Sequence, residues 1–267
     1  MKKNNKKMIN LIILAVICAV VAINLFHACT PTPSPEEVKA QNEATYEACK
    51  EDLLTCIAFV EGFKSKPYFC GSKWTIGYGT TVFPKGTRVT KKAKPISKDY
   101  AKECVFAHCD KRIKPFILKY VTRVLDKEEM LGTCLFVYNV GGEQFSGYRE
   151  NGKKVRKESA FLTSLNKDDD RLETCQKMTG FRASAGKRAN GLLKRHWLQS
   201  AIFMGILTPE DLLDLKPEGL YKPNLSFYYD KTKANKDGYW EYNFSPEKVK
   251  KFVKQNSNAK NNVRAIL

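Results

Sequence analysis

Apolar residues recur with a helical period in the stretch that runs from about Glu43 to Gly62. One face of this stretch, at the spacing i, i+1, i+4 and i+7, is formed by Leu53, Leu54, Ile57 and Val60. That spacing predicts an amphipathic helix, and the glycine predicts its end. Glu61 falls on the apolar face at the last position of this helix. A carboxyl group in apolar surroundings keeps its proton to a higher pH, which suits a general acid. A carboxylate that turns to solvent at a frayed helix end is the alternative.

The segment after this helix has the composition of a β-hairpin. Residues 68–70 and 74–82 are rich in aromatic and β-branched side chains, and they flank the short turn Gly71-Ser72-Lys73. Such a pattern predicts two antiparallel strands.

Three further elements are predicted beyond residue 207. They are a short helix capped at Thr208, a second hairpin formed by residues 227–229 and 239–242, and a basic helix from Ser245 to about Gln255. The aromatic residues of the second hairpin are expected to pack on the preceding domain, with a grip on glycan as the alternative.

A lysine-rich stretch and a long apolar run open the chain. Lysines at positions 2, 3, 6 and 7 precede residues 8–26, in which Asn10 and Asn24 are the only polar interruptions. This arrangement predicts export. Residues 1–29 are expected to be a membrane anchor that leaves the rest of the chain in the periplasm or another extracytoplasmic space. A lipoprotein signal cleaved before Cys29 and an ordinary cleaved signal are the alternatives.

A proline-rich spacer follows the apolar run. The alternating prolines of residues 30–37 favour an extended polyproline II tether, and residues 30–47 are expected to form a linker. The predicted organisation continues with a catalytic domain over residues 48–207 and a C-terminal extension over residues 208–267.

The amino-acid composition limits the classes of partner and cofactor that the chain is expected to bind. The 46 Lys and Arg exceed the 28 Asp and Glu, and a net charge of +18 predicts an anionic partner: nucleic acid, an acidic membrane or a cell-wall polymer. A hydrophobic content of 43% excludes wholesale disorder. The nine cysteines include no C-x-x-C pair, and there are only three histidines, so neither a metal nor another cofactor is expected.

Glu61, Cys70 and Thr75, followed by Gly77-Tyr78-Gly79, resemble the active-site stretch of phage-type lysozymes, the endolysins of glycoside hydrolase family 24. Further stretches in the family's order are residues 125–145 with Asn139-Val140-Gly141, residues 159–168 with Lys167 in place of a glycine, residues 181–187 and residues 191–195. The resemblance covers about residues 48–207. It implies an α+β, mostly α fold in which a small β-hairpin lobe and a helical lobe surround a cleft.

Residue roles follow from this resemblance. Glu61 is expected to be the general acid, with Cys70 as thiolate base or nucleophile and Thr75 orienting the attacking water. A buried or disulfide-bonded structural cysteine is the alternative for Cys70. Tyr68, Tyr78 and Asn139 are candidate substrate-binding residues. The alternatives are packing aromatics for the tyrosines and a turn or capping amide for Asn139. The basic residues Lys194 and Arg195 are expected to form a solvated helix face.

The chain departs from the family pattern at the proposed site. Cys70 replaces the usual second carboxylate, and no Asp or Glu occurs in residues 62–84. Only four residues separate Cys70 from Thr75, one fewer than in the family. Because a change of one residue reverses the faces of a strand, the direction of Thr75 is left open. Thr80 stands where the family has a histidine.

The expected function is therefore an exported muramidase that hydrolyses the β-1,4 bond between N-acetylmuramic acid and N-acetylglucosamine in peptidoglycan. Its partners are glycan strands and, through the N-terminal segment, the membrane. Nucleic acid is excluded as a partner because of the export signal and the lack of a recognition motif. A lytic transglycosylase using Glu61 alone and a non-catalytic wall-binding domain are the alternatives.

Overall fold

The computed structural model describes residues 32–150, 153–184, 187–188, 190–234, 240–242 and 246–256. Val38–Leu267 is one compact unit, and Met1–Glu37 is a second unit, described by itself. The predicted signal or anchor at residues 1–29 lies outside the described residues. Within the described ranges, no helix combines the length and the apolar character needed to cross a membrane.

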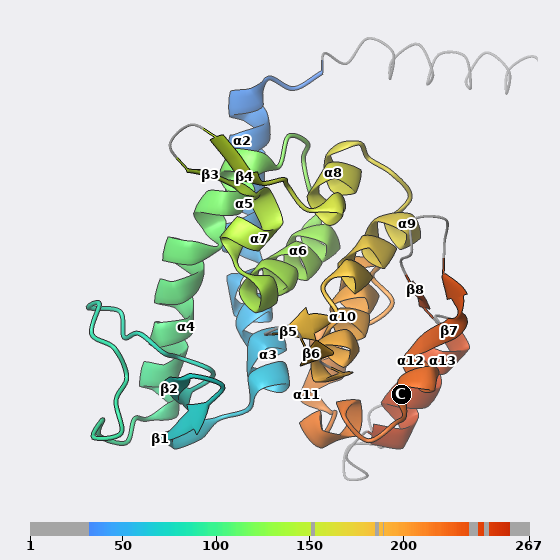
Figure 1. Cartoon of the computed structure of the whole chain (residues 1–267). Coiled ribbons are helices and arrows are strands. Elements are labelled where there is room, and N and C mark those ends of the chain that lie inside the picture. Colours follow the sequence, from blue (N-terminus) through green and yellow to red (C-terminus); the bar gives the residue numbers. More distant parts are fainter. Residues whose placement is uncertain are drawn as a thin grey trace, which may run out of the picture. The chain divides into compact units, whose positions relative to one another are not determined.

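Helices make up most of the described chain (Figure 1). The α-helices and 3₁₀ helices are α2 (Pro35–Ala48), α3 (Lys50–Glu61), α4 (Lys98–Arg112), α5 (Lys114–Tyr120), α6 (Lys127–Val140), α7 (Gly142–Ser146), α8 (Ala160–Asn166), α9 (Arg171–Gln176), η1 (Lys177–Gly180), α10 (Asn190–Phe203), α11 (Pro209–Leu213), η2 (Pro217–Leu220), α12 (Leu225–Tyr228) and α13 (Pro246–Asn256). The strands form four two-stranded antiparallel hairpins: β1 (Lys64–Cys70) with β2 (Lys73–Gly77), β3 (Tyr148–Glu150) with β4 (Lys153–Arg156), β5 (Ala183–Ser184) with β6 (Lys187–Arg188), and β7 (Tyr229–Ala234) with β8 (Trp240–Tyr242). The mostly helical α+β fold with a small hairpin is confirmed.

Helix α2 corrects the predicted linker. The extended spacer expected through residue 37 ends earlier, because a helix begins at Pro35. The Ser34 hydroxyl accepts a hydrogen bond from the Glu37 N–H, and the Glu37 carboxylate accepts one from the Ser34 N–H. Ser, Pro and Glu at these three positions form a capping box with proline in the first turn, which starts a helix even in a proline-rich sequence.

The α6–α10 pair forms the centre of the compact unit, where the two helices lie side by side (Figure 1). Gly132 makes this close approach feasible, since a Cβ there would lie 2.4 Å from the Phe203 Cβ. Most of α6 is buried from Glu129 to Val137. Residues 125–145, the stretch that resembles the family, contain two helices, α6 and α7, which are separated by Gly141 at a φ of 87°.

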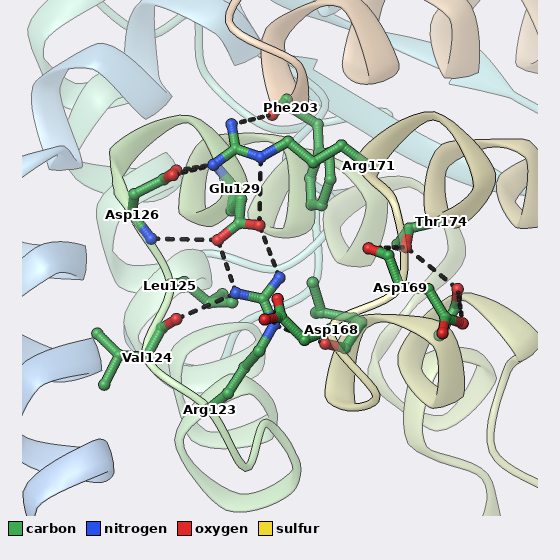
Figure 2. A network of polar contacts seen from close by, with 12 residues as sticks. Arg123, Val124, Leu125, Asp126, Glu129, Asp168, Asp169, Arg171, Thr174 and Phe203 are labelled. Atoms are coloured by element: carbon green, nitrogen blue, oxygen red, sulfur yellow. Dashed lines mark hydrogen bonds and ion pairs between the residues drawn. The ribbon is translucent and has the colours of Figure 1, made fainter. Parts of the chain in front are cut away.

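A buried network of charges fixes the beginning of α6. Figure 2 shows Arg123 and Arg171 meeting the Glu129 carboxylate, which is only 4% exposed. Two hydrogen bonds of 2.6 and 2.9 Å join Arg123 to Glu129, and Arg171 Nε lies 3.5 Å from it. Arg171 also pairs with Asp126, the N-cap of α6. A buried carboxylate is stable only when it is paired in this way, so the network stabilises the first turn of α6.

The turn after α8 differs by one position from the expectation. Lys167 was expected to stand in for the family's glycine, but Lys167 has an ordinary φ of −80°. Asp168, the following residue, adopts the left-handed conformation with a φ of 57°. Aspartate tolerates this conformation better than most residues.

The C-terminal elements pack on α10. Trp197 is fully buried, with its ring centroid 5.1 Å from Tyr228 and 5.4 Å from Phe252. Tyr229 and Tyr242 of the second hairpin are also buried. The predicted short helix, hairpin and basic helix are present as α11, β7–β8 and α13, but residues 227 and 228 of the predicted hairpin belong to α12. Tyr228, Tyr229 and Tyr242 are buried as expected, whereas Tyr239 lies outside the described residues.

Candidate active site

A carboxylate and a guanidinium from distant parts of the sequence meet at the end of α3. Glu61 is the last residue of α3, and Arg195 lies in α10. Arg195 Nη1 donates to Glu61 Oε1 at 2.8 Å and Nη2 to Oε2 at 3.3 Å. The side chains are 16% exposed for Glu61 and 28% for Arg195. This two-pronged geometry orients both groups.

Two opposed effects act on the proton of Glu61. Burial raises the pKa of the Glu61 carboxyl, because the charged form loses hydration. The charge and hydrogen bonds of Arg195 act in the other direction, but burial prevails and the pKa stays above its ordinary value. The carboxyl is therefore suited to hold and give a proton.

Gly79 leaves space beside this carboxyl. A Cβ at Gly79 would lie 3.6 Å from Glu61 Oε2 and 3.4 Å from the Tyr138 hydroxyl, and the residue has a φ of 90°. Tyr138 of α6 donates a hydrogen bond to the Tyr78 carbonyl oxygen at 2.9 Å. The Gly-Tyr-Gly segment is thus bound to α6 immediately next to Glu61.

Arg195 connects Glu61 to two further residues. Its Nη1 lies 3.3 Å from Asn139 Oδ1, and its Nε donates to the Tyr221 hydroxyl at 3.1 Å. Burial lowers the pKa of Arg195, but the Glu61 charge, Tyr221 and the hydrogen bonds to both residues together outweigh burial, and the pKa is raised. The guanidinium is therefore charged at any physiological pH and fixes the centre of the site.

The hairpin brings Cys70, Thr75 and Tyr68 to one face. Thr75 lies directly opposite Tyr68, and Cys70 is two residues beyond Tyr68 on the same strand. Opposed residues share a face of a hairpin, as do alternate residues of one strand. The shortened turn at Gly71 and Ser72 therefore leaves Thr75 and Cys70 on the same face.

These three side chains differ in their surroundings. Cys70 is exposed, whereas Thr75 is 6% exposed and donates a hydrogen bond of 3.4 Å to the Lys73 carbonyl oxygen. Burial raises the pKa of the Tyr68 hydroxyl, and the nearby Cys70 and Glu61 raise it further. Tyr68 is thus close to both the thiol and the carboxyl.

A cleft of about 720 Å³ begins at Gly79 and Asn139, beside the Glu61–Arg195 pair. Its walls are the segment 79–86, the α4 helix, and the end of α6 with the beginning of α7. Polar side chains in these walls are Lys73, His108, Lys111, Arg112, Glu143 and Gln144. Its position beside the Glu61 carboxyl, whose pKa is raised by burial, fits a polar chain-like substrate. No group of His, Cys, Asp and Glu in the described ranges is arranged to hold a metal ion.

The site includes residues that the sequence did not identify. Arg195 is not part of a solvated helix face, as was expected, because it is paired with Glu61 and partly buried. Tyr138 and Tyr221 were not singled out either. The Tyr78 ring is only 8% exposed and lies 5.4 Å from the Phe63 ring, so its backbone carbonyl rather than its ring is directed to the site.

Comparison with known proteins decides the family. The family model for phage lysozyme matches residues 58–197, a little over half of the chain. The chain belongs to the phage lysozyme family. Phage lysozymes lyse peptidoglycan, so this member is a lytic enzyme whose substrate is the cell wall. The matched residues include Glu61, Asn139 and Arg195 but not Tyr221.

Solved structures similar to this phage lysozyme include three phage enzymes. A mutant of P22 lysozyme is 21% identical, with 57% of this chain and 94% of that chain covered and a TM-score of 0.46. An endolysin from Escherichia coli O157:H7 phage FAHEc1 is 22% identical, with coverages of 59% and 94% and a TM-score of 0.48. The active form of P1 phage endolysin Lyz is 16% identical, with coverages of 72% and 95% and a TM-score of 0.47. No curated protein matches the chain.

Proposed function

We propose that this phage lysozyme is a muramidase, which hydrolyses the β-1,4 bond between N-acetylmuramic acid and N-acetylglucosamine. The observation that carries the proposal is the largely buried Glu61 carboxyl with a raised pKa, which lies next to Gly79 at the edge of a polar cleft. A carboxyl of this kind protonates the glycosidic oxygen as the bond to the anomeric carbon breaks. Water then adds its hydroxyl to that carbon and releases a proton.

In this proposal Cys70 and Thr75 act on the water molecule that attacks the anomeric carbon. They share one face of the hairpin, and no carboxylate occurs from residue 62 to residue 98 to take the role of the second acid. Thr75 is proposed to orient the water, and Cys70 to accept its proton or to act as nucleophile. Tyr68 and Asn139 are proposed to contact the sugar, while the buried Tyr78 anchors the Gly-Tyr-Gly segment to Tyr138.

A lytic transglycosylase is the second candidate, since it needs one carboxyl group. It is favoured by the same lack of an acidic residue between Glu61 and Asp99. In that reaction a hydroxyl of the substrate itself attacks the anomeric carbon, and the product ends in anhydro-muramic acid.

Mass spectrometry of digested peptidoglycan distinguishes these candidates. We expect the wild type to produce reducing muramic ends and Glu61→Gln, which keeps an acceptor for Arg195, to produce none. Cys70→Ser and Thr75→Val, compared with the exposed Ser72→Ala, then test the water side. Anhydro ends would establish the transglycosylase instead. If the folded wild type and the folded variants all release no soluble fragments, the protein is not a lytic enzyme, and the wall-binding domain is the remaining reading.

We also propose that the enzyme works outside the cytoplasmic membrane, held there by residues 1–29, and that residues 48–207 and 208–267 are its catalytic domain and C-terminal extension. The support is the lysine-rich start followed by the apolar run of residues 8–26. Fractionation of cells that produce the full chain tests the proposal. Protein in the soluble cytoplasmic fraction alone contradicts it.

A further inference from the structure

The extension beyond the family match reaches into the active site through a single side chain. Tyr221 directly follows η2. Its hydroxyl accepts a hydrogen bond from Arg195 Nε at 3.1 Å and donates one to the Val60 carbonyl oxygen at 3.4 Å. Val60 directly precedes Glu61 in the last turn of α3. One phenol therefore joins the backbone that carries Glu61 to the side chain that binds it.

The backbone of Tyr221 is itself held against α10. Lys194 Nζ donates to the carbonyl oxygens of Tyr221 and Pro223, each at 2.6 Å. Gly191 is the other neighbour, and a Cβ there would lie 4.0 Å from the Tyr221 ring. Tyr221 is 38% exposed, and its contacts with residues 191 to 195 of α10 hold it in place at the surface.

The guanidinium of Arg195 is planar, so its orientation is set by partners on more than one edge. Glu61 and Asn139 engage the two Nη atoms, and Tyr221 engages Nε. Without the hydrogen bond at Nε, the guanidinium is held through its Nη atoms only. The long arginine side chain can then rotate and turn the guanidinium away from the carboxylate.

We propose that Tyr221 is a positioning residue of the active site, whose hydroxyl holds the Arg195 guanidinium against the Glu61 carboxylate. The C-terminal extension is therefore part of the lytic machinery. The expected effect of Tyr221 on lysis rests on the proposed role of Glu61 as general acid. The contact between Tyr221 and Arg195 can be measured without catalysis.

The titration of Glu61 reports on this contact. The groups that face it are Arg195 from α10, Tyr138 from α6 and Tyr68 from β1, with Tyr221 behind the guanidinium. Of these, Arg195 alone is charged at neutral pH, and it opposes the effect of burial on the carboxyl. A guanidinium that is held less firmly stabilises the carboxylate less, so the pKa of Glu61 rises.

The test compares Tyr221→Phe with Tyr242→Phe in the full chain. Both changes remove one hydroxyl of the extension that bonds to α10, but Tyr242 bonds to Ser200 and His196 and not to Arg195. The Glu61 carboxyl is titrated by carbon-13 NMR, and lysis of purified peptidoglycan is measured over the same pH range. Thermal unfolding confirms that each variant is folded.

We expect the titration midpoint of Glu61 in Tyr221→Phe to rise by about 0.5 pH unit, with no change in Tyr242→Phe. Since a general acid acts in its protonated form, the high-pH limb of lysis should move upward by the same amount. An unchanged midpoint in Tyr221→Phe overturns the proposal. A raised midpoint without a matching move of the limb supports the positioning role and instead contradicts the assignment of Glu61 as general acid.

Discussion

At the scale of single residues, the proposed chemistry depends on the balance between burial of the Glu61 carboxyl and the charge of Arg195 beside it. Burial favours the neutral form of Glu61, and Arg195 favours the charged form. Both effects act on the pKa of the same carboxyl. In the proposed mechanism, a change around the guanidinium therefore shifts the pH range in which the enzyme is active.

Arg195→Gln removes the opposing effect. The pKa of Glu61 should rise further, and the high-pH limit of lysis should move upward by about one pH unit or more. The sign follows because the acid is needed in its protonated form, which persists to higher pH when the pKa is higher. The pH profile of peptidoglycan lysis measures this shift. Arg88→Gln, the same change at an exposed loop position, should leave the limit in place. A downward move in Arg195→Gln would contradict the account.

Cys70 offers a second prediction at this scale, because it is the exposed cysteine among the seven that are described. Burial raises the pKa of Cys49 and of Cys109 to about 12, so both remain unreactive thiols. Iodoacetamide should therefore modify Cys70 first within the described ranges, and lysis should fall in parallel with labelling.

Peptide mass spectrometry and lysis assays follow the two events together. The Cys70→Ser variant serves as the control, since any activity it retains should resist the reagent. Full labelling of Cys70 with undiminished lysis would remove the thiol from the proposed mechanism.

Part of the site is readable from the sequence and part is not. Glu61 is predictable because its helix, its apolar face and the following Gly-Tyr-Gly segment are all local. Arg195 lies 134 positions away, and its own helix pattern only shows a polar position. Which polar residue of α10 turns inward is decided by tertiary packing, so no local pattern indicates it. The stretch of residues 191–195 that resembles the family was the available signal.

At the scale of elements, helix ends and helix contacts determine the arrangement around the cleft. The capping box at Ser34 starts a helix where proline content favours an extended chain, because two side-chain hydrogen bonds satisfy the first backbone N–H groups. The hairpins β3–β4 and β5–β6 were not predicted, since strands of two to four residues carry little periodic signal. The β1–β2 hairpin and the elements beyond residue 207 were predicted from the sequence.

Gly132 tests the α6–α10 contact. Alanine is the better helix former by about 1 kcal/mol, yet an added Cβ would lie 2.4 Å from Phe203 Cβ and 2.8 Å from its Cα. The Cα and Cβ of Phe203 belong to the rigid part of α10 and cannot rotate away. The cost of overpacking should therefore exceed the gain in helix propensity, and Gly132→Ala should lower the free energy of unfolding by about 2 kcal/mol.

Denaturant unfolding measures that loss. Gly191→Ala is the matched control, since it lies in α10 and its added Cβ would meet nothing closer than 4.0 Å. It should be neutral or slightly stabilising. Equal stability of the two variants would show that the helices separate at no cost.

At the scale of the whole molecule, positive charge is concentrated on the lobe beside the cleft. Residues 62–98 contain nine Lys and Arg and no Asp or Glu, which is half of the net charge of +18. Lys91, Lys92 and Lys94 are exposed in this segment. A field of one sign next to a cleft attracts anionic polymers such as the carboxylate-bearing cell wall.

This distribution predicts that salt inhibits lysis. Raising NaCl from about 50 to about 500 mM should slow lysis roughly tenfold, since the screening length falls well below the size of the lobe. Replacing Lys91, Lys92 and Lys94 together by Gln should weaken this dependence more than the same replacement at the exposed Lys157, Lys167 and Lys250. Equal effects of the two triple variants would mean that net charge, and not its place, governs the rate.

The contact between Tyr221 and Arg195 has a consequence for the order of events during synthesis. Glu61 leaves the ribosome early, whereas Arg195 and Tyr221 follow more than 130 positions later. The carboxyl therefore lacks these partners until residues 195 and 221 have been made. Under the proposed mechanism, a chain that ends before residue 195 carries Glu61 without the groups that orient it, and we expect such a chain to lack lytic activity.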